Sequence, residues 1–530
     1  MTAIEHIEKV EQWGRFELTL QGRLDGNPYL DVQLTAQFAL GQQSIEVSGF
    51  YDGAGTYRVR FMPENQGTWT YKTSSNCAEL NAVEGSLTCI APAATNHGPV
   101  RVADANHFAY ADGKPYHPVG TTCYVWNLQG EPLESQTLET LKSSPFNKIR
   151  FCVFPKRYQF NENDPATYPF PGEVKRETSP KFSLSPSSTP PPDYWDFSQF
   201  IPEYFQHLEQ RIADLQVLGI EADLILFHPY DFGAWGFDRM PAEVNDRYLK
   251  YVVARFSAYR NLWWSFANEY ELLFDRKMED WDHYFQLVQQ ADPYNHLRSI
   301  HNIKEFYDHS KPWVTHTSVQ HHDVAKVAAW QKQYGRPVVV DECGYEGDID
   351  QFWGNLTPQE MVLRFWLGFA NGGYVGHGET YLNKEEVLWW SKGGELKGES
   401  IARIEFLRRI IEAVPGAGLV PLNSTRFEDM VSMSEVMALF STVSEAAAML
   451  GAGAFHAVSA GRSGSDYFLL YFGNHQPSFL DFALLPGNFK IDIIDTWNMT
   501  TTCFVEKVSG AVKVTLPRLP YQAIRIERVA

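Results

Sequence analysis

Two glutamates follow short apolar segments, a position from which carboxylates can do acid–base chemistry. Glu269 follows the segment LWWSFAN (262–268), and Glu342 follows PVVVD (337–341). Cleavage of a glycosidic bond needs such a pair, because one carboxylic acid protonates the leaving oxygen while an ionised carboxylate attacks the anomeric carbon. A single glutamate at the end of a strand can equally cap the strand or begin the next helix. The pair together indicates glycoside cleavage.

Other candidate residues lie at or just after further apolar segments and would face the same site. Charged and amide side chains there can bind sugar hydroxyls, and exposed aromatic rings can stack on sugar faces. Each also has a structural alternative, since a buried histidine or arginine can pair within the core and a tryptophan can pack in a loop. The candidates are Arg150, His228, Trp126, Trp235, Gln320, His321 and Glu379.

Several other chemistries lack support in the sequence. Gln320 is followed by two histidines, but adjacent side chains point in different directions and no H-E-x-x-H motif occurs, so we expect no metal. No G-x-S-x-G motif follows a strand. Cys343, next to Glu342, fits a small neighbour of the carboxylate better than a nucleophile. No glycine-rich phosphate loop follows a strand, so we expect no cofactor.

The elements that must position these residues alternate between short apolar segments and longer amphipathic ones. Eight β/α repeats over this length predict a TIM barrel, whose active site lies at the carboxyl ends of the strands. A doubly wound sheet is the alternative, but it normally has fewer strands. The predicted strands are 116–122, 148–154, 222–228, 261–268, 297–301, 313–319, 337–342 and 373–377, and the predicted helices are 137–141, 200–218, 242–259, 280–290, 324–334, 357–370 and 400–413.

The predicted barrel, residues 96–418, is interrupted by a long proline-rich loop and flanked by β-rich segments. The loop, 155–193, follows the second strand, so we expect it to form a wall or lid of the site. Residues 1–95 alternate in short strands and predict an immunoglobulin-like β-sandwich. Residues 419–530 predict a second β-sandwich. The fold class is therefore α/β and multidomain, with a central TIM barrel between two sandwiches.

Composition limits the partners and the location. The chain has 530 residues and a formal net charge of −19, which argues against nucleic acid or an anionic membrane as the main partner. No apolar stretch is long enough to span a membrane, and the N-terminus does not look like a signal peptide. The six cysteines are scattered without a CxxC pair, as in proteins with reduced thiols. We therefore expect a cytoplasmic protein.

The two glutamates, with Asn268 before the first, resemble the catalytic arrangement of clan A glycoside hydrolases. Within that clan, the segment YHPVGTTCYVW (116–126) resembles the apiosidase-like barrel family, and VSGFYDGAGTYRVRFMP (47–63) resembles the β-sandwich that often precedes that barrel. The resemblance implies that Glu269 is the acid/base and Glu342 the nucleophile. It also implies that Asn268 binds the sugar 2-hydroxyl and that Arg150 hydrogen-bonds the nucleophile.

The function expected from these observations is that of a retaining glycoside hydrolase acting on a carbohydrate substrate. A pocket closed by the 155–193 loop favours exo action on short oligosaccharides or glycosides. Two alternatives stay open: a carbohydrate-binding or structural protein on a decayed barrel, and a barrel hydrolase that uses a metal, which a chelator would reveal. The sandwiches could bind glycan, pack on the barrel or form a homo-oligomer.

Overall fold

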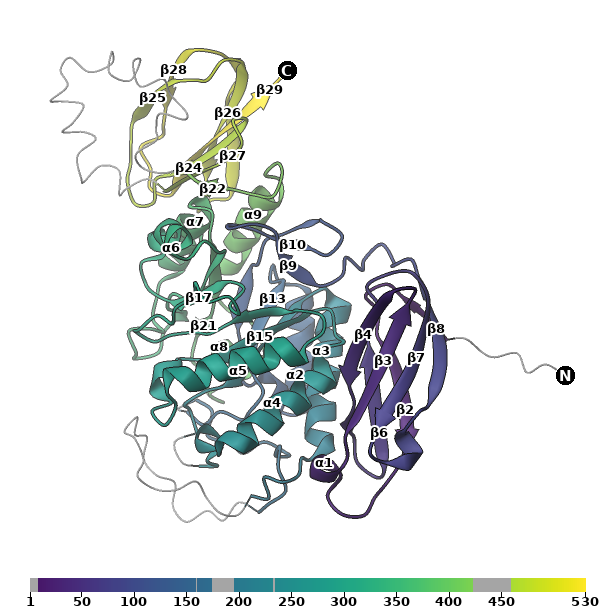
Figure 1. Cartoon of the computed structure of the whole chain (residues 1–530). Helices are drawn as coiled ribbons and strands as arrows, with labels where there is room; N and C mark the ends of the chain where they lie inside the picture. The colour runs from purple at the N-terminus through teal and green to yellow at the C-terminus, as the bar shows by residue number, and fades with distance from the viewer. Residues whose placement is uncertain (1–7, 159, 174–194, 232–233, 423–458) are drawn as a thin grey trace.

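The computed structural model describes residues 8–158, 160–173, 195–231, 234–422 and 459–530. They form a central β/α barrel, an N-terminal β-sandwich beside it and a C-terminal β-sandwich against its last helices (Figure 1). This architecture confirms the predicted fold class. No helix within these ranges is both long and apolar enough to cross a membrane.

The barrel is an eight-stranded sheet whose paired strands are all parallel. The strands run in the order β16, β15, β14, β13, β12, β20, β18, β17. Across the remaining gap, between β16 and β17, the backbone N–H of Thr315 donates to the carbonyl of Arg298 at 3.0 Å. The eight predicted strands all coincide or overlap with the observed ones. These are β12 (Gly120–Thr122), β13 (Lys148–Cys152), β14 (Glu221–Phe227), β15 (Leu262–Ala267), β16 (Leu297–Ser299), β17 (Thr317–Gln320), β18 (Val338–Glu342) and β20 (Tyr374–His377).

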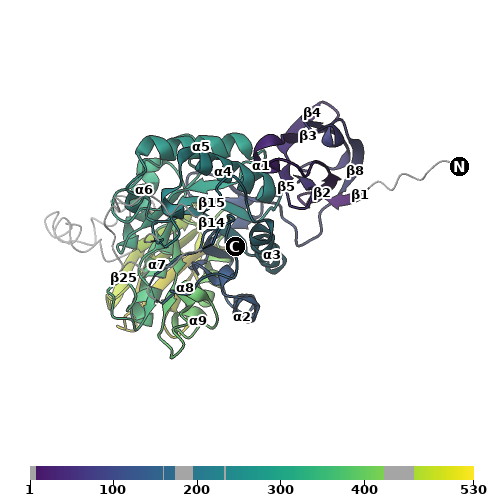
Figure 2. The ribbon, with the colours of Figure 1, turned by 90° about the horizontal axis from the view of Figure 1, so that it is seen from below.

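Helices surround the strands, as Figure 2 shows from below. Between β16 and β17, residues 300–316 are fully described and contain no helix, so one repeat lacks its helical half. The first helix begins well before the predicted 137–141, because Gly130 and a proline in the first turn start it earlier. The helices are α2 (Glu131–Lys142), α3 (Pro202–Leu218), α4 (Ala242–Phe256), α5 (Met278–Ala291), α6 (Val327–Tyr334), α7 (Pro358–Ala370), α8 (Trp389–Lys392) and α9 (Ser400–Glu412).

A buried charged cluster lies inside the barrel. The ammonium of Lys148 lies 2.5 Å from a carboxylate oxygen of Asp223 and 2.8 Å from one of Asp341. Ser318 donates a further hydrogen bond to Asp341 at 2.5 Å. Burial lowers the pKa of Lys148, but the two carboxylates outweigh it and raise that pKa above its ordinary value. Lys148 thus joins β13 to β14 and β18, and Ser318 adds β17 to the cluster.

A small three-stranded sheet packs under the amino ends of the barrel strands. The ring centroid of Phe108 lies 5.3 Å from that of Trp263 and 5.6 Å from that of Tyr374, so this sheet joins the barrel core. Its strands are β9 (Val100–Val102), β10 (Phe108–Tyr110) and β11 (Pro115–Tyr116).

The N-terminal sandwich consists of a five-stranded sheet, β1-β8-β7-β3-β4, packed on a three-stranded sheet, β2-β6-β5. Phe38 from one sheet stacks on Phe61 from the other with centroids 4.0 Å apart. A single-turn helix, α1 (Pro28–Asp31), lies between β2 and β3. The strands are β1 (Glu8–Glu11), β2 (Phe16–Gln21), β3 (Leu34–Leu40), β4 (Gln43–Ser48), β5 (Phe50–Tyr51), β6 (Thr56–Phe61), β7 (Gly67–Ser75) and β8 (Glu84–Ile90).

A buried ion network joins this sandwich to the barrel. Arg255 of α4 lies 2.7 Å from Asp52 of the sandwich and 2.9 Å from Glu209 of α3. Arg60 of β6 pairs with Glu209 as well, and it donates to the carbonyl of Arg255 at 2.7 Å. Each charge thus has a partner across the interface.

The C-terminal sandwich packs on α7 and α9. The ring of Trp366 lies 5.3 Å from that of Tyr471, and Arg403 lies over the ring of Trp497 at 3.7 Å. The predicted C-terminal domain, 419–530, includes 423–458, which are outside the described residues. The described strands are β22 (Val420–Pro421), β23 (Ser459–Ser463), β24 (Tyr467–Tyr471), β25 (Phe479–Ala483), β26 (Asn488–Asp495), β27 (Thr500–Val508), β28 (Ala511–Thr515) and β29 (Gln522–Val529).

Candidate active site

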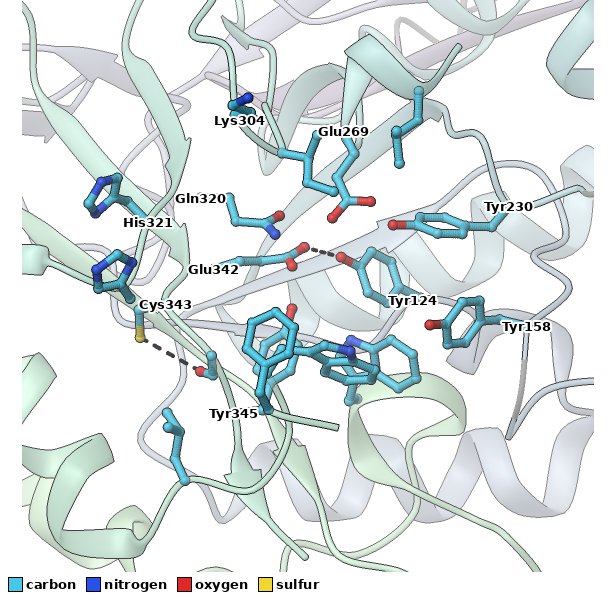
Figure 3. Close-up of a pocket in the computed structure, with 18 of the residues that line it drawn as sticks. Tyr124, Tyr158, Tyr230, Glu269, Lys304, Gln320, His321, Glu342, Cys343 and Tyr345 are labelled. Atoms are coloured by element: carbon cyan, nitrogen blue, oxygen red, sulfur yellow. Dashed lines mark hydrogen bonds between the residues drawn. The ribbon is translucent and has the colours of Figure 1, made fainter. Parts of the chain in front are cut away.

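A pocket of about 750 Å³ opens at the carboxyl ends of the barrel strands, and both predicted catalytic glutamates line it. The carboxylates of Glu269 and Glu342 point toward each other across it (Figure 3). Its lining residues come from loops after most of the strands. They are Tyr124, Lys156, Tyr158, Tyr230, Glu269, Leu272, Ile303, Lys304, Gln320, His321, His322, Glu342, Cys343, Gly344, Tyr345, Phe352, Trp353, Leu356, Arg364 and Trp390.

Glu342 ends β18 and is held as an ionised carboxylate. Arg150 donates to its Oε1 at 3.0 Å, and the Tyr124 hydroxyl donates to the same oxygen. Burial pushes the pKa of Glu342 upward, but His301, Arg150 and Tyr124 outweigh it and hold that pKa below its ordinary value. His301 is itself neutral near pH 7, because burial lowers its pKa to about 3. The positive charge that keeps Glu342 ionised is therefore that of Arg150.

Glu269, unlike Glu342, lies in an environment that favours the protonated carboxyl group. It follows β15 with a left-handed backbone (φ 47°), which is unfavourable for glutamate, and its side chain is only 6% exposed. Burial first, and then the charge of Glu342, raise its pKa to about 8, although Lys156 and Gln320 act in the opposite direction. One carboxyl group of the pair thus keeps its proton near pH 7 while the other is ionised.

Asn268 directly precedes Glu269 and shares two hydrogen-bond partners with Glu342. Its Oδ1 accepts from Arg150 at 2.8 Å, and the Tyr124 hydroxyl lies 3.1 Å from the same atom. Tyr124 has one proton, so it can serve only one acceptor at a time, and carboxylate is the stronger acceptor. Within the described structure the buried Nδ2 of Asn268 has no hydrogen-bond partner, which leaves it free to donate to a ligand.

Two other predicted site residues line the pocket beside the glutamates. Gln320, at the end of β17, points into the space between the two carboxylates (Figure 3). The ring of His321 points away from them and stacks on His322, with centroids 4.7 Å apart. The backbone N–H of His321 donates to the carbonyl of Glu342 at 2.9 Å, so this residue also fixes the end of β18.

His228 and Glu379 are buried close to the site but do not line the pocket. The Nε2 of His228 lies 3.2 Å from the carbonyl of Phe154, and its Nδ1 accepts from the backbone N–H of Tyr230 at 3.2 Å. His228 therefore positions Tyr230, which does line the pocket. The carboxylate of Glu379, on the short strand β21 (Glu379–Thr380), accepts the backbone N–H groups of 397 and 398 at 2.7 Å each. It ties the end of the barrel to the segment before α9.

The structure places Trp126 and Trp235 in the hydrophobic core, which corrects the expectation that they stack on sugar. Both side chains are fully buried. Trp126 packs edge-to-face on Phe151, and the carbonyl of Trp235 accepts from the indole of Trp195 at 2.7 Å. Stacking needs an accessible ring face, and neither residue offers one.

The aromatic wall of the pocket comes instead from residues that do not end a predicted strand. Tyr158 and Trp353 from two loops pack together with Trp390 of α8, with ring centroids 4.9–6.5 Å apart. Tyr158 and the neighbouring Lys156 belong to the loop predicted as a wall, and they do line the pocket. In the remainder of that loop, residues 159 and 174–193 lie outside the described part of the chain. Lys156 and Tyr158 lie only a few residues after the end of β13, and this position is the sequence signal that could have identified them as site residues.

Metal ligation has no candidate among the described residues, where no group of three or more His, Cys, Asp and Glu side chains is arranged to hold an ion. The histidines after β17 stack on each other rather than converging. The described residues of the pocket offer a carboxylic acid, a carboxylate and hydrogen-bond donors.

Comparison with known families agrees with this geometry. The model of the apiosidase-like catalytic domain matches residues 103–415. The chain belongs to the apiosidase-like family. Membership confirms the resemblance drawn from the sequence and the expectation of a glycosidase. In the same chain, two domains of unknown function match residues 9–76 (DUF5060) and 456–527 (DUF5605).

Two solved structures are similar to this chain over most of its length. A crystal structure of a "putative glycoside hydrolase" from Bacteroides vulgatus ATCC 8482 is 39% identical, covers 98% of this chain and 100% of its own, and has a TM-score of 0.85. A glycoside hydrolase family 5 structure from the same organism is 14% identical, covers 82% of this chain and 93% of its own, and shares the fold with a TM-score of 0.58. Among curated proteins, none matches this apiosidase-like sequence.

Proposed function

We propose that this apiosidase-like protein is a retaining glycoside hydrolase with Glu269 as acid/base and Glu342 as nucleophile. The observation that carries the assignment is the contrast between the two environments in one pocket. The pKa of Glu269 is raised to about 8 by burial and by Glu342, whereas Arg150 and Tyr124 hold the pKa of Glu342 low. Pairs of carboxyl groups whose environments separate their pKa values divide acid and base roles in this way.

The reaction then proceeds in two steps. Glu269 gives its proton to the glycosidic oxygen as the bond from that oxygen to the anomeric carbon breaks, and Glu342 forms a bond to the same carbon. Glu269, now ionised, takes a proton from water, whose oxygen attacks the anomeric carbon and releases Glu342 as carboxylate. In this mechanism the carboxyl groups lie about 5–5.5 Å apart. The free Nδ2 of Asn268 would donate to the sugar 2-hydroxyl.

We also propose exo action on short oligosaccharides or glycosides. The packed rings of Tyr158, Trp353 and Trp390 form a wall on one side of the pocket. A polysaccharide chain could not continue through this wall, so the terminal sugar would be the one bound. Release of a single sugar size from defined oligosaccharides supports exo action, whereas internal chain fragments would contradict it. Short substrates also agree with the cytoplasmic location expected from the sequence, because small sugars can be imported.

The experiment that tests the assignment is a screen of the wild type and Glu342→Ala against 4-nitrophenyl pyranosides and furanosides. We expect at least one glycoside to be hydrolysed by the wild type and not by the variant. Added azide should restore turnover of Glu342→Ala and yield a glycosyl azide of inverted configuration. NMR of the first product formed by the wild type should show the anomeric configuration of the substrate. An inverted product would contradict the proposed roles.

A further inference from the structure

Lys156 lies between aromatic rings at the edge of the two-glutamate site. It follows β13 by four residues, and its side chain is only 2% exposed. Its Nζ lies 3.4 Å from the ring centroid of Tyr124, 4.3 Å from that of Tyr230, 4.5 Å from that of Trp390 and 5.5 Å from that of Tyr158. These four rings are the aromatic cage. Cations are attracted to such ring faces, so the cage holds the ammonium in one place.

The ammonium of Lys156 can donate hydrogen bonds, but it has no acceptor among the residues that the structure describes. An ammonium carries three N–H donors, and ring faces do not replace carboxylate or carbonyl acceptors. Among the described residues, none forms an ion pair or hydrogen bond with Nζ, although the backbone carbonyl of Lys156 accepts from Asn161. A buried cation without acceptors is costly. Because Lys156 lines the pocket, water or a bound ligand in the pocket can supply the acceptors.

The cage also links Lys156 to the nucleophile. The Tyr124 ring that lies against the ammonium carries the hydroxyl that donates to Glu342. A cation on a phenol ring favours the phenolate and so strengthens the O–H as a donor. Lys156 therefore lies one side chain away from the carboxylate that attacks the sugar, on the side where Tyr124 stands.

We propose that Lys156 is a sugar-binding residue, whose caged ammonium donates to hydroxyl oxygens of the same sugar unit that Glu342 attacks. This inference rests on the proposed function. Three donors on one nitrogen can reach neighbouring hydroxyl groups at once. The substrate class it implies is glycosides whose terminal sugar keeps those hydroxyls free, without ester or ether substituents. The residue acts on binding and orientation and does not exchange a proton with the reacting bond.

The test pairs variants of Lys156 with substrates that lack single hydroxyls. The probes are the 4-nitrophenyl glycoside hydrolysed by the wild type and its monodeoxy analogues. Lys156→Met should lower kcat/KM for the parent about 10- to 100-fold, as for loss of a hydrogen bond from a charged donor. For the analogue that lacks the contacted hydroxyl, wild type and variant should differ less than threefold. Lys156→Gln keeps a donor without the charge, so its kcat/KM for the parent glycoside should lie between those of the wild type and Lys156→Met.

Control variants distinguish a loss of substrate binding from misfolding and from a nonspecific effect of removing a lysine charge. Lys392→Met removes a lysine on α8, the helix that carries Trp390, and Lys392 does not line the pocket, so its kcat/KM should match the wild type. Near-UV circular dichroism checks that the cage tryptophan and tyrosines stay packed in each variant. If Lys156→Met does not fold, the comparison rests on Lys156→Gln, which is polar like the residue it replaces.

Three outcomes would overturn the inference. The first is an equal loss on the parent and on every monodeoxy analogue, which would mean that Lys156 contacts no hydroxyl. The second is a loss confined to glycosides of uronic acids, which would mean that it binds a carboxylate instead. The third is a failure of wild type to hydrolyse any glycoside, which removes the proposed function as well. If Glu342→Ala is rescued by azide while the Lys156 variants behave like Lys392→Met, the proposed function stands and this inference alone fails.

Discussion

Arg150 donates to Oε1 of Glu342 at 3.0 Å, and both side chains are buried in the barrel. The second guanidinium nitrogen donates to Asn268 at 2.8 Å, so one planar group fixes a carboxylate and an amide together. A guanidinium is permanently charged and directs its N–H groups in a fixed plane, which a lysine cannot reproduce. The nucleophile is thus ionised and oriented by the same residue.

Replacement of Arg150 should therefore separate charge from geometry. Arg150→Lys keeps the charge but loses the two-pronged contact, so we expect kcat/KM to fall about 10²–10³-fold, as for loss of one oriented donor. The kcat/KM of Arg150→Met should fall further. The acid limb of its pH profile should move to higher pH, because loss of the guanidinium raises the pKa of Glu342. An Arg150→Lys variant with wild-type kcat/KM would contradict this role.

We expect the hydroxyl of Tyr124 to contribute to kcat. Tyr116, which precedes β12 as Tyr124 follows it, provides a matched control. The Tyr116 hydroxyl donates to the carbonyl of Asn147 at 2.9 Å, away from the pocket. Tyr124→Phe should lower kcat about 10- to 100-fold and raise the pKa seen in the acid limb. Tyr116→Phe should cost about 1 kcal/mol in the free energy of unfolding and leave kcat unchanged. Steady-state kinetics and urea unfolding of both variants check this contrast.

The pH dependence of kcat/KM should show a broad plateau. The first step needs protonated Glu269, whose pKa is raised to about 8, so activity should fall above about pH 8. It also needs ionised Glu342, whose pKa is lowered, so activity should persist below the ordinary pKa of glutamate. Burial lowers the pKa of Lys156 to about 8 as well, and the alkaline limb therefore reports both groups. An alkaline limb near pH 5 would show that Glu269 is not the acid.

Removal of the acid should affect substrates according to their leaving groups. Glu269→Ala should retain most of its glycosylation rate with 2,4-dinitrophenyl glycosides, whose leaving group needs no proton. With a sugar leaving group the loss should be about 10²–10⁴-fold, the usual contribution of a general acid. Azide should react with the glycosyl-enzyme of this variant to give a product of retained configuration. Equal losses on both kinds of substrate would contradict the assignment.

Lys148 should contribute to stability more than to binding. Lys148→Met would leave Asp223 and Asp341 buried without their cation, and such broken pairs cost about 3–5 kcal/mol. The control is Lys142→Met, which removes an exposed lysine at the end of α2 and should change the free energy of unfolding by about 0.5 kcal/mol or less. Chemical denaturation of the two variants gives the comparison.

The barrel and its two glutamates could be predicted from the pattern of apolar segments and from the position of each glutamate at the end of such a segment. Buried parallel strands appear in a sequence as short apolar segments, and the residue after such a segment lies at the carboxyl end of the barrel. This reasoning placed Glu269, Glu342 and Gln320 in one pocket.

The remaining site residues depend on contacts that a linear pattern does not contain. Glu379 follows a strand like the two glutamates, yet its carboxylate is taken by backbone N–H groups 18 and 19 residues further along the chain. Trp126 and Trp235 follow strands as well, but the loops fold their rings into the core. Lys156 lies in a proline-rich segment without a hydrophobic period. It joins the site through four packed rings, three of which are distant from it in the sequence.

The ion network between the N-terminal sandwich and the barrel bears on how such proteins can recombine. Asp52 and Arg60 of the sandwich contact Arg255 and Glu209 of the barrel, and within the barrel Glu209 and Arg255 also pair with each other. A barrel without this sandwich would expose the buried pair of Glu209 and Arg255 to water, and each of the two residues would lose its ion pair with the sandwich. We therefore expect a sandwich exchanged between relatives to pack stably on the new barrel only when the charged residues on both sides of the interface match.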